Sequence, residues 1–418
     1  YTNRKNLLKL ESSAQDQESE TTFKQLTEKT LLSDDIVDVS LPGQKANIAP
    51  EDISFVQFSS GSTGSPKGVV LKHRNLIANI EGIQKCAAFS SKDTTLSWMP
   101  LTHDMGLIGF HINPIVSNAS HYIMRTDLFA RRPLYWMTAA SEKKVSVLCS
   151  PNFGYKHFLN TFKRKGLSGI DLSQVRLIFN GAEPISANLC KQFTDELAQY
   201  GLSKQSMFPV YGLAEASVAV SFPKIGTDLQ IVQAQRDSLS INTTVILGAQ
   251  NNNYVPLVGV GAPIDNCKVR ISNEHGNELP DNTIGHIHIG GSSVTEEIIS
   301  DDDPAFFEDG WIDTGDLGFV SEQGLFITGR YKEILFVNGQ NYYPYDLEDI
   351  LLQIPELELG KIVVAGAPAK HGDLEEVLVF ILHKGKLNKF IPLRAQIKTV
   401  VNEQFGIEVH QVIPINKV

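Results

Sequence analysis

The residues best suited to chemistry lie in one short stretch, FVQFSSGSTGSPKGVVLKH, at positions 55–73. A run of β-forming residues leads into a loop of small and hydroxylated residues, and a lysine lies near the end of that loop. Small residues let the backbone approach an anion, while hydroxyls, backbone N–H groups and one ammonium group donate to phosphate oxygens. The candidate phosphate-binding residues are Ser59, Ser60, Gly61, Ser62, Thr63, Gly64 and Lys67.

This loop is not the Walker A loop of nucleoside triphosphatases. That pattern requires Gly-Lys-[Ser/Thr], whereas here Pro66 precedes Lys67 and Gly68 follows it. A flexible surface loop is the alternative interpretation. Repeated Ser/Thr-Gly steps that end in Pro-Lys-Gly, directly after a β-like run, favour anion binding over that alternative.

Two later motifs follow predicted strands, where open parallel sheets bind their ligands. NGAEP (180–184) comes directly after one strand, although taken alone it is better explained as an ordinary turn. YGLAEAS (211–217) follows another, and the ring of Tyr211 could stack on a purine. Glu215 is a hard oxygen ligand suited to Mg²⁺; a solvated glutamate at a helix start is the alternative.

Two further motifs, GWIDTGDLG (310–318) and GRYKEILFVNGQNYYPYDLE (329–348), complete the set. Asp316 is a carboxylate in a tight turn, suited to accept hydrogen bonds from two ribose hydroxyls. An Asx-turn, which aspartate favours in any protein, is the alternative interpretation.

In this order, the five motifs resemble those of the adenylate-forming superfamily: acyl-CoA synthetases, peptide-synthetase adenylation domains and luciferases. The resemblance extends over residues 55–348 and implies ATP and Mg²⁺ as cofactors, with Glu215 as the metal ligand. It implies that Lys67, Glu215 and Arg330 are catalytic and that Lys332 is the hinge of a mobile C-terminal domain. The nucleotide site that it implies adds Gly181, Ala182, Glu183, Pro184, Tyr211, Gly212, Asp316 and Arg330 to the loop residues.

The implied reaction joins two anions, because a carboxylate attacks the α-phosphate of ATP to give an acyl-adenylate and pyrophosphate. A thiol then takes the acyl group and AMP leaves. Cations must therefore be concentrated locally, and Mg²⁺, Lys67 and Arg330 are the candidates.

The segment LSWMPLTHDMGLIGFHINPI (96–115) resembles that of fatty acyl-AMP ligases, which load acyl carrier proteins of polyketide and peptide synthases. It lacks the Phe-Asp pair of amino-acid-activating domains. The implied acyl pocket contains His103, Met105, Gly106, Leu107 and Phe153, although a core histidine is an equal alternative for His103. Phe110, Phe153 or Tyr155 are candidates for closing the tunnel.

A second feature favours the same branch. From Glu215 to Gly261 there are 261 − 215 = 46 positions, longer than expected for a CoA ligase. Fatty acyl-AMP ligases carry an insertion in this region that hinders productive use of CoA. We place the corresponding insertion at residues 224–256.

The leading hypothesis is therefore a fatty acyl-AMP ligase that loads an acyl carrier protein, expected in the same polypeptide or assembly line. Three alternatives stay open: an acyl-CoA ligase, an adenylation domain for a short branched, hydroxy or amino acid, and a non-catalytic adenylate-binding domain. Relative to the family, the chain looks truncated at its start. It also stops before the Pro-[Lys/Arg]-Thr-x-x-Gly-Lys segment that follows VIPINKV, and Lys417 does not match that segment's final lysine by spacing.

Apolar runs alternate with helical patterns after Ile53, which predicts an α/β fold with parallel sheets covered by helices. The expected parts are residues 1–222, the α/β part of a large N-terminal domain; 223–329, a β-rich subdomain resembling a small barrel; and 330–418, a mobile α+β domain. Predicted strands are 55–58, 95–98, 145–149, 175–179, 207–210, 243–247, 258–260, 268–271, 285–289, 325–327, 362–365, 377–382 and 412–413. Predicted helices are 75–89, 132–143, 155–163, 187–200 and 393–405, with another beginning after Pro344 and a turn at 337–339. Residues 1–50 are predicted to be a polar connector.

Composition excludes several classes of protein. A net charge of −10 argues against a nucleic-acid partner or a polybasic membrane binder. Four scattered cysteines without a CxxC pair predict neither a zinc site nor a disulfide framework. A cytoplasmic location is expected, because a reducing compartment fits this use of cysteine best.

Overall fold

The structure is a computed structural model that describes residues 2–14, 17–35, 46–60, 66–248, 253–300, 306–307, 309–337, 340–357, 360–368 and 375–416. The chain forms two compact units, Tyr1–Ala49 and Pro50–Val418. Several residues singled out above lie outside the described ones, namely Gly61, Ser62, Thr63, Gly64, Asn338, Gly339 and Lys417.

The first unit contains two helices, α1 (Arg4–Ser13) and α2 (Gln17–Glu28), neither of which was predicted from the sequence within this polar segment. Asn3 caps α1 by accepting a hydrogen bond from the N–H of Asn6 at 2.8 Å. An ion pair of 2.7 Å between Arg4 and Asp35 joins α1 to the turn at Ser33–Asp35. Local capping and pairing therefore order a segment that has little apolar content.

The candidate phosphate loop connects two antiparallel strands, β1 (Ile53–Ser60) and β2 (Pro66–Lys72), and Ser59 pairs with Lys67. A third strand, β14 (Ile298–Ile299), pairs with β2 opposite Val69 and Gly68. The expectation that residues 55–58 belong to the parallel sheet is wrong. The residues after the loop form a second strand that pairs back on the first.

The parallel sheet has the order β4-β3-β5-β6-β7. Its strands are β3 (Thr94–Ser97), β4 (Ser120–Ile123), β5 (Val147–Ser150), β6 (Leu177–Asn180) and β7 (Met207–Pro209). β5, β6 and β7 are buried along their whole length, as is typical of parallel strands covered on both faces. The four of these strands that the sequence predicts are confirmed to within two residues at each end; β4 was not predicted.

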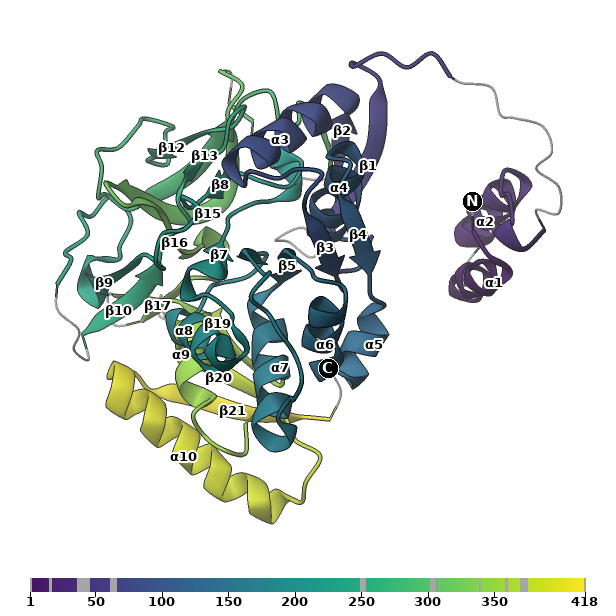
Figure 1. The fold of residues 1–418 in the computed structure, drawn as a ribbon. Helices are drawn as coiled ribbons and strands as arrows, with labels where there is room; N and C mark the ends of the chain where they lie inside the picture. Colours follow the sequence, from purple (N-terminus) through teal and green to yellow (C-terminus); the bar gives the residue numbers. More distant parts are fainter. Residues whose placement is uncertain are drawn as a thin grey trace. The chain divides into compact units, whose positions relative to one another are not determined.

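Helices cover this sheet (Figure 1). They are α3 (His73–Cys86), α4 (Asn113–Val116), α5 (Thr126–Arg131), α6 (Leu134–Glu142), α7 (Asn152–Lys165) and α8 (Ala187–Leu197). Buried aromatic rings join the helices, with Tyr155 of α7 and Phe193 of α8 at 4.8 Å between centroids and Trp136 of α6 beside both. The helices predicted near 75–89, 132–143, 155–163 and 187–200 are confirmed.

The following part is β-rich and antiparallel, as predicted. A four-stranded sheet has the order β12-β13-β15-β16, and β9 and β10 form a two-stranded sheet. The strands are β8 (Ser221–Phe222), β9 (Ile231–Gln235), β10 (Tyr254–Val258), β11 (Ala262–Pro263), β12 (Lys268–Ser272), β13 (Gly285–Gly290), β15 (Ile312–Ser321) and β16 (Gly324–Arg330). The strand predicted at 243–247 is wrong, because Thr244 and Leu247 bridge to two different neighbours and no continuous ladder forms.

The C-terminal part has its own apolar core, which includes Leu347, Val379 and Ile397. Its elements are β17 (Leu335–Val337), β18 (Gln340–Tyr342), α9 (Pro344–Leu351), β19 (Ile362–Pro368), β20 (Glu375–Leu382), α10 (Leu387–Phe405) and β21 (Val409–Ile415). α10 starts six residues earlier than predicted, even though Pro392 lies inside it. Phe390 is buried on the same face as Leu393 and Ile397, and this packing outweighs the backbone bond that proline removes.

A hydrogen bond, a cation–π contact and an ion pair join this part to the β-rich part. The hydroxyl of Tyr343 lies 3.2 Å from Thr328 Oγ1, and the guanidinium of Arg236 lies 4.5 Å from the ring centroid of Phe405. Arg236 also pairs with Asp346 at 3.5 Å.

The division of the chain at residues 222 and 329 stays a prediction. Within the described residues, no helix combines the length and apolar character needed to cross a membrane.

Candidate active site

A cavity of about 600 Å³ lies where the carboxyl ends of β6 and β7 meet the β-rich part. The turn after β7, the start of β15 and the residues after β16 contribute to its wall, so segments far apart in the sequence converge there. Crevices at the carboxyl ends of parallel strands are the usual ligand sites of such sheets. The predicted site residues that line it are Lys67, His103, Met105, Gly181, Ala182, Tyr211, Gly212, Glu215, Arg330 and Lys332.

Lys67 and Glu215 form an ion pair at this cavity. Lys67 comes from the start of β2, directly after the candidate loop, and its side chain is 31% exposed. Glu215 lies in a short 3₁₀ turn, Ala214–Ala216, and is only 5% exposed. A buried carboxylate needs a counter-charge, and Lys67 supplies it in this structure. The structure therefore brings together the two residues that the sequence assigned to phosphate and metal.

The turn that carries Glu215 is fixed by a buried amide. Asn79 of α3 donates to the carbonyls of Ala216 and Ala219 at 2.9 and 2.8 Å and accepts from the N–H of Ala219 at 3.1 Å. The turn is tight, since Ser217 has φ +66° and a Cβ at Gly212 would lie 1.8 Å from the carbonyl oxygen of Val218. Asn79 was not predicted as part of the site, because nothing in the sequence separates it from other helix asparagines.

Tyr211, Asp316 and Arg330 form a second polar cluster. The Tyr211 hydroxyl donates to Asp316 Oδ2 at 2.6 Å, and Arg330 Nε lies 3.2 Å from Asp316 Oδ1. Burial raises the pKa of the Asp316 carboxyl above its ordinary value, and Arg330 and the Tyr211 hydroxyl offset this only in part. Burial beside Asp316 also raises the pKa of Tyr211, so its hydroxyl stays protonated and donates.

The Asx-turn that was the alternative for Asp316 is made by Asp313 instead. Asp313 Oδ1 accepts a hydrogen bond from the N–H of Gly315 at 2.8 Å. Burial acts to raise the pKa of Asp313, but the His286 ring, 3.4 Å away, and the hydrogen bond from Gly315 hold it below its ordinary value. The Asp316 carboxylate therefore does not make the Asx-turn hydrogen bond. It lies behind Tyr211 and Arg330 and is not among the described residues that line the cavity.

The NGAEP motif divides between the cavity and the fold. Gly181 and Ala182 line the cavity, but Glu183 accepts a hydrogen bond from the N–H of Phe153 in the first turn of α7. A carboxylate there is favoured by the free N–H groups of the helix start. Burial raises the pKa of Glu183, and this hydrogen bond opposes the change. Neither Glu183 nor Pro184 is among the described cavity residues.

Only part of the predicted acyl pocket lines the cavity. Met105 and Phe110 lie in a π-helix, Met105–Ile112, and line the cavity together with His103. A hydrogen bond with Asp104 at 2.7 Å raises the pKa of His103, although burial opposes it. π-Helical turns are rare in proteins overall, and those that occur are frequently found at functional sites.

Four other predicted pocket residues lie elsewhere. Gly106 packs on the backbone of Pro100, and Leu107 packs on the apolar cluster behind β2. Phe153 is 42% exposed, with its ring edge-on to Trp98, and Tyr155 is fully buried and donates to the carbonyl of Phe179. The apolar wall instead includes Ile83, Phe89, Phe179 and Phe222, which the sequence does not distinguish from ordinary core residues.

Parallel strands that end at such a cavity are typical of nucleotide-binding α/β proteins. The comparison with protein families narrows this class. An AMP-binding enzyme family matches residues 2–298, and the chain belongs to that family.

Two curated relatives are similar over most of this chain. It is 33% identical over 350 residues to a medium-chain-fatty-acid–[acyl-carrier-protein] ligase of Teredinibacter turnerae, covering 79% of this chain and 54% of the relative. It is 32% identical over 369 residues to a long-chain-fatty-acid–AMP ligase of Mycobacterium tuberculosis, covering 83% and 62%. The chain therefore spans less than two thirds of the length of either relative.

Solved structures of similar proteins agree with this fold. One, from a study of fatty acyl-adenylate ligases from E. coli and L. pneumophila, has a TM-score of 0.85 and 29% identity and covers 100% of this chain and 75% of that one. Another, a fatty acyl-adenylate ligase from L. pneumophila in complex with acyl adenylate and pyrophosphate, has a TM-score of 0.67 and 28% identity and covers 89% and 68%. The α/β fold with β-rich and C-terminal parts is that of adenylate-forming enzymes.

Proposed function

We propose that this chain belongs to an ATP-dependent ligase that activates a fatty acid as its acyl-adenylate and transfers the acyl group to the phosphopantetheine thiol of an acyl carrier protein. The observation that carries the proposal is one cavity that joins the Lys67–Glu215 pair to an apolar wall. The polar end suits the phosphates, and the apolar wall suits an acyl chain. The names of the two curated relatives support the same reaction and acceptor.

In the first step, a carboxylate oxygen of the acid bonds to the α-phosphorus of ATP. The bond from that phosphorus to the bridging oxygen breaks, and pyrophosphate leaves with the electron pair. Lys67 and Arg330 neutralise the charge that accumulates, since fixed cations stabilise such a transition state. In the second step, a thiolate sulfur bonds to the acyl carbon, the bond from that carbon to the phosphate oxygen breaks, and AMP leaves with the electron pair.

Glu215 is the residue that would hold a magnesium ion, which supplies further neutralisation of the phosphates. The fit is physical, because Glu215 is a buried hard oxygen donor beside the cation that would face the same phosphates. Among the described residues, no group of three or more His, Cys, Asp or Glu could hold a metal. Phosphate oxygens and water would therefore supply most of the ligands, as is usual for magnesium.

The remaining assignments belong to the same proposal. Gly181, Ala182, Tyr211 and Gly212 face the adenine, Asp316 holds the ribose, and Lys332 is the hinge. The acyl carrier protein would be part of the same polypeptide or assembly line, as in a polyketide or peptide synthase. We include a cytoplasmic location, supported by four cysteines that are all free thiols.

ATP–pyrophosphate exchange by the full-length protein tests the activation step. We expect exchange with straight-chain fatty acids and none with amino acids; the reverse would reject the fatty-acid assignment, and exchange with no acid would favour a non-catalytic adenylate-binding protein. Acyl transfer is then measured with a phosphopantetheinylated carrier protein and with CoA. Rapid acyl-CoA formation without a carrier would identify a CoA ligase instead.

Phe110 is expected to limit the length of the acyl chain, because it lines the cavity and packs edge-on against Phe179 at 5.5 Å. Phe110→Ala should raise kcat/KM for longer acids about fourfold for each methylene group that the new space accommodates, since burying one is worth ~0.8 kcal/mol. Phe153→Ala is the matched control and should leave the preference unchanged. Exchange rates over a series of chain lengths measure both, and a shift only in the Phe153 variant would contradict this placement.

A further inference from the structure

The two charged residues of the phosphate site come from segments 148 positions apart, and one buried residue contacts both segments. That residue is Thr295, in the stretch 292–297 between β13 and β14, and it is 3% exposed. Its backbone N–H donates to the carbonyl oxygen of Glu215 at 2.8 Å. Its hydroxyl donates to the carbonyl oxygen of Val70 in β2 at 2.5 Å. Val70 lies three residues after Lys67 on that strand.

The hydroxyl of Thr295 has a single proton and two carbonyl oxygens within reach, that of Val70 at 2.5 Å and that of Glu297 at 2.9 Å, and the shorter distance favours Val70. With the proton directed to Val70, the oxygen is free to accept the N–H of Glu297, which lies 3.2 Å away. The N–H of Val70 in turn donates to the carbonyl of Glu297 at 3.1 Å. The side chain is therefore fully hydrogen-bonded, and its removal would leave a buried carbonyl without its partner.

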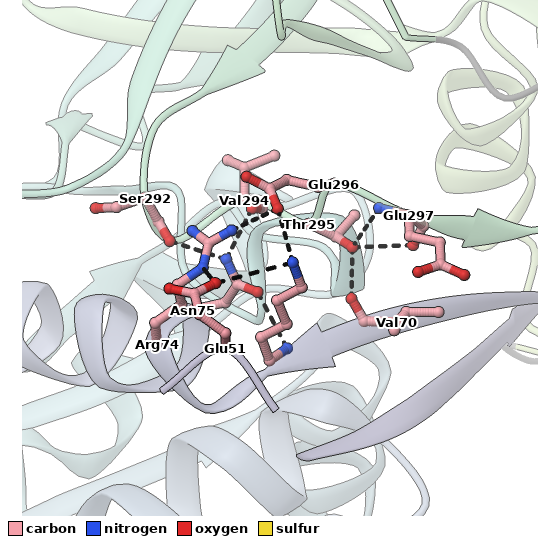
Figure 2. Close-up of polar contacts among 10 residues, drawn as sticks. Glu51, Val70, Arg74, Asn75, Ser292, Val294, Thr295, Glu296 and Glu297 are labelled. Atoms are coloured by element: carbon pink, nitrogen blue, oxygen red, sulfur yellow. Dashed lines mark hydrogen bonds and ion pairs between the residues drawn. The ribbon is translucent and has the colours of Figure 1, made fainter. Parts of the chain in front are cut away.

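Side chains of α3 and β2 hold the stretch that carries Thr295, and Figure 2 draws these polar contacts. On the inner side, Asn75 of α3 donates to the carbonyls of Ser292 and Val294, both at 3.0 Å. On the outer side, Glu296 pairs with Lys72 and Arg74, which also pair with Glu51. Glu51 and Glu296 are more than half exposed, so these ion pairs contribute little each. The buried hydrogen bonds determine the position of the stretch.

We infer that Thr295 is a positioning residue that sets the geometry of Lys67 relative to Glu215. This inference rests on the proposed function, in which these two residues bind the phosphates and their cation. Thr295 does not line the cavity and acts only through the backbone of β2 and of the glutamate turn. Because small displacements of charged groups cost large factors in rate, the loss of one hydroxyl here should be visible in catalysis.

Thr295→Val removes the hydroxyl and keeps the shape of the side chain. We expect kcat of ATP–pyrophosphate exchange to fall about tenfold, with KM for the fatty acid within about twofold of wild type. Thr295→Ser keeps the hydroxyl and should restore kcat to within about threefold. The second readout is calorimetric binding of Mn²⁺–pyrophosphate without any acid, for which the valine variant should bind about tenfold more weakly.

Thr194→Val is the matched control. Thr194 is also buried, at 5% exposed, and its hydroxyl lies 3.2 Å from a carbonyl, that of Cys190 in α8, but it is not a cavity residue. The Thr194→Val variant should have a lower thermal unfolding temperature, with ATP–pyrophosphate exchange and Mn²⁺–pyrophosphate binding unchanged. If Thr295→Val behaves in the same way as this control, the inference is wrong and Thr295 is only structural.

The outcomes separate the inference from the proposed function. A wild-type protein that exchanges with no acid rejects the proposed function, while the Mn²⁺–pyrophosphate arm still tests Thr295. If the valine variant does not fold, Thr295→Cys, which keeps a weak donor, is measured in both arms. We expect the cysteine variant to lower kcat of exchange and the affinity for Mn²⁺–pyrophosphate about threefold each. Wild-type values in both measurements would overturn the inference.

Discussion

Lys67→Ala is expected to lower kcat of ATP–pyrophosphate exchange about 100-fold, the typical effect of removing one fixed group that stabilises developing charge. The ammonium group is at the cavity and pairs with a carboxylate that is 5% exposed. Its loss removes a phosphate ligand and leaves Glu215 without a counter-charge. Urea unfolding should therefore also show a decrease of about 1–3 kcal/mol in the free energy of unfolding.

Lys85→Ala is the control for this variant. Lys85 pairs with Asp265, but its side chain is 73% exposed and it lies at the end of α3, outside the cavity lining. Exchange and stability should remain close to wild type. A Lys67→Ala protein with wild-type kcat would remove Lys67 from the chemical step, whatever its effect on stability.

Asp316→Ala is expected to raise KM for ATP about 30-fold and to change kcat little, because its role in the proposal is to hold the ribose. Hydrogen bonds to a charged group are worth about 1.5–3 kcal/mol, which corresponds to this range. KM for pyrophosphate in the reverse direction should stay unchanged, since pyrophosphate has no ribose. Steady-state kinetics in both directions measure the two values.

A modified nucleotide provides the control for Asp316. 2′-Deoxy-ATP should bind less well than ATP to the wild type, and Asp316→Ala should not discriminate between them. The discrimination should also weaken as the pH falls through the raised pKa of Asp316, because protonation removes the acceptor charge. If the variant retains the wild-type preference for ATP, Asp316 serves only to hold Tyr211 and Arg330.

The polar residues of the candidate site came from local motifs. Residue types singled out Lys67, Tyr211 and Glu215, the family resemblance added Arg330, and all four line one cavity. The sheet was predictable for the same reason, since β5 and β6 are continuous apolar runs bounded by polar residues.

The apolar wall was not predictable. Ile83, Phe89, Phe179 and Phe222 line the cavity, yet a periodic apolar pattern reports only that a side chain avoids water. It does not say whether the neighbour is another side chain or an empty volume. Phe153 was selected instead for its place in the sequence, and its contact with Trp98 depends on how α7 packs against the segment that follows β3.

Long-range pairing limited the other predictions. β2 pairs with β1 through the loop and with β14 more than two hundred residues later, and the second contact has no local signal. The hydrogen bond of the Thr295 hydroxyl also has no local signal in the sequence. Threonine next to a turn is common, and its partner Val70 lies on a distant strand. Asp313, rather than Asp316, makes the Asx-turn, a choice between two aspartates that only the backbone geometry decides.

The Lys67–Glu215 pair has a consequence for which ligands can enter. A ligand that carries only one sign of charge has to separate the pair and leaves the opposite charge unpaired next to it, which is costly for a carboxylate as buried as Glu215. A phosphate that arrives with its counter-cation replaces both partners at once, so neither side chain is left alone. The ion pair itself thus discriminates against free anions and free cations before any shape is recognised.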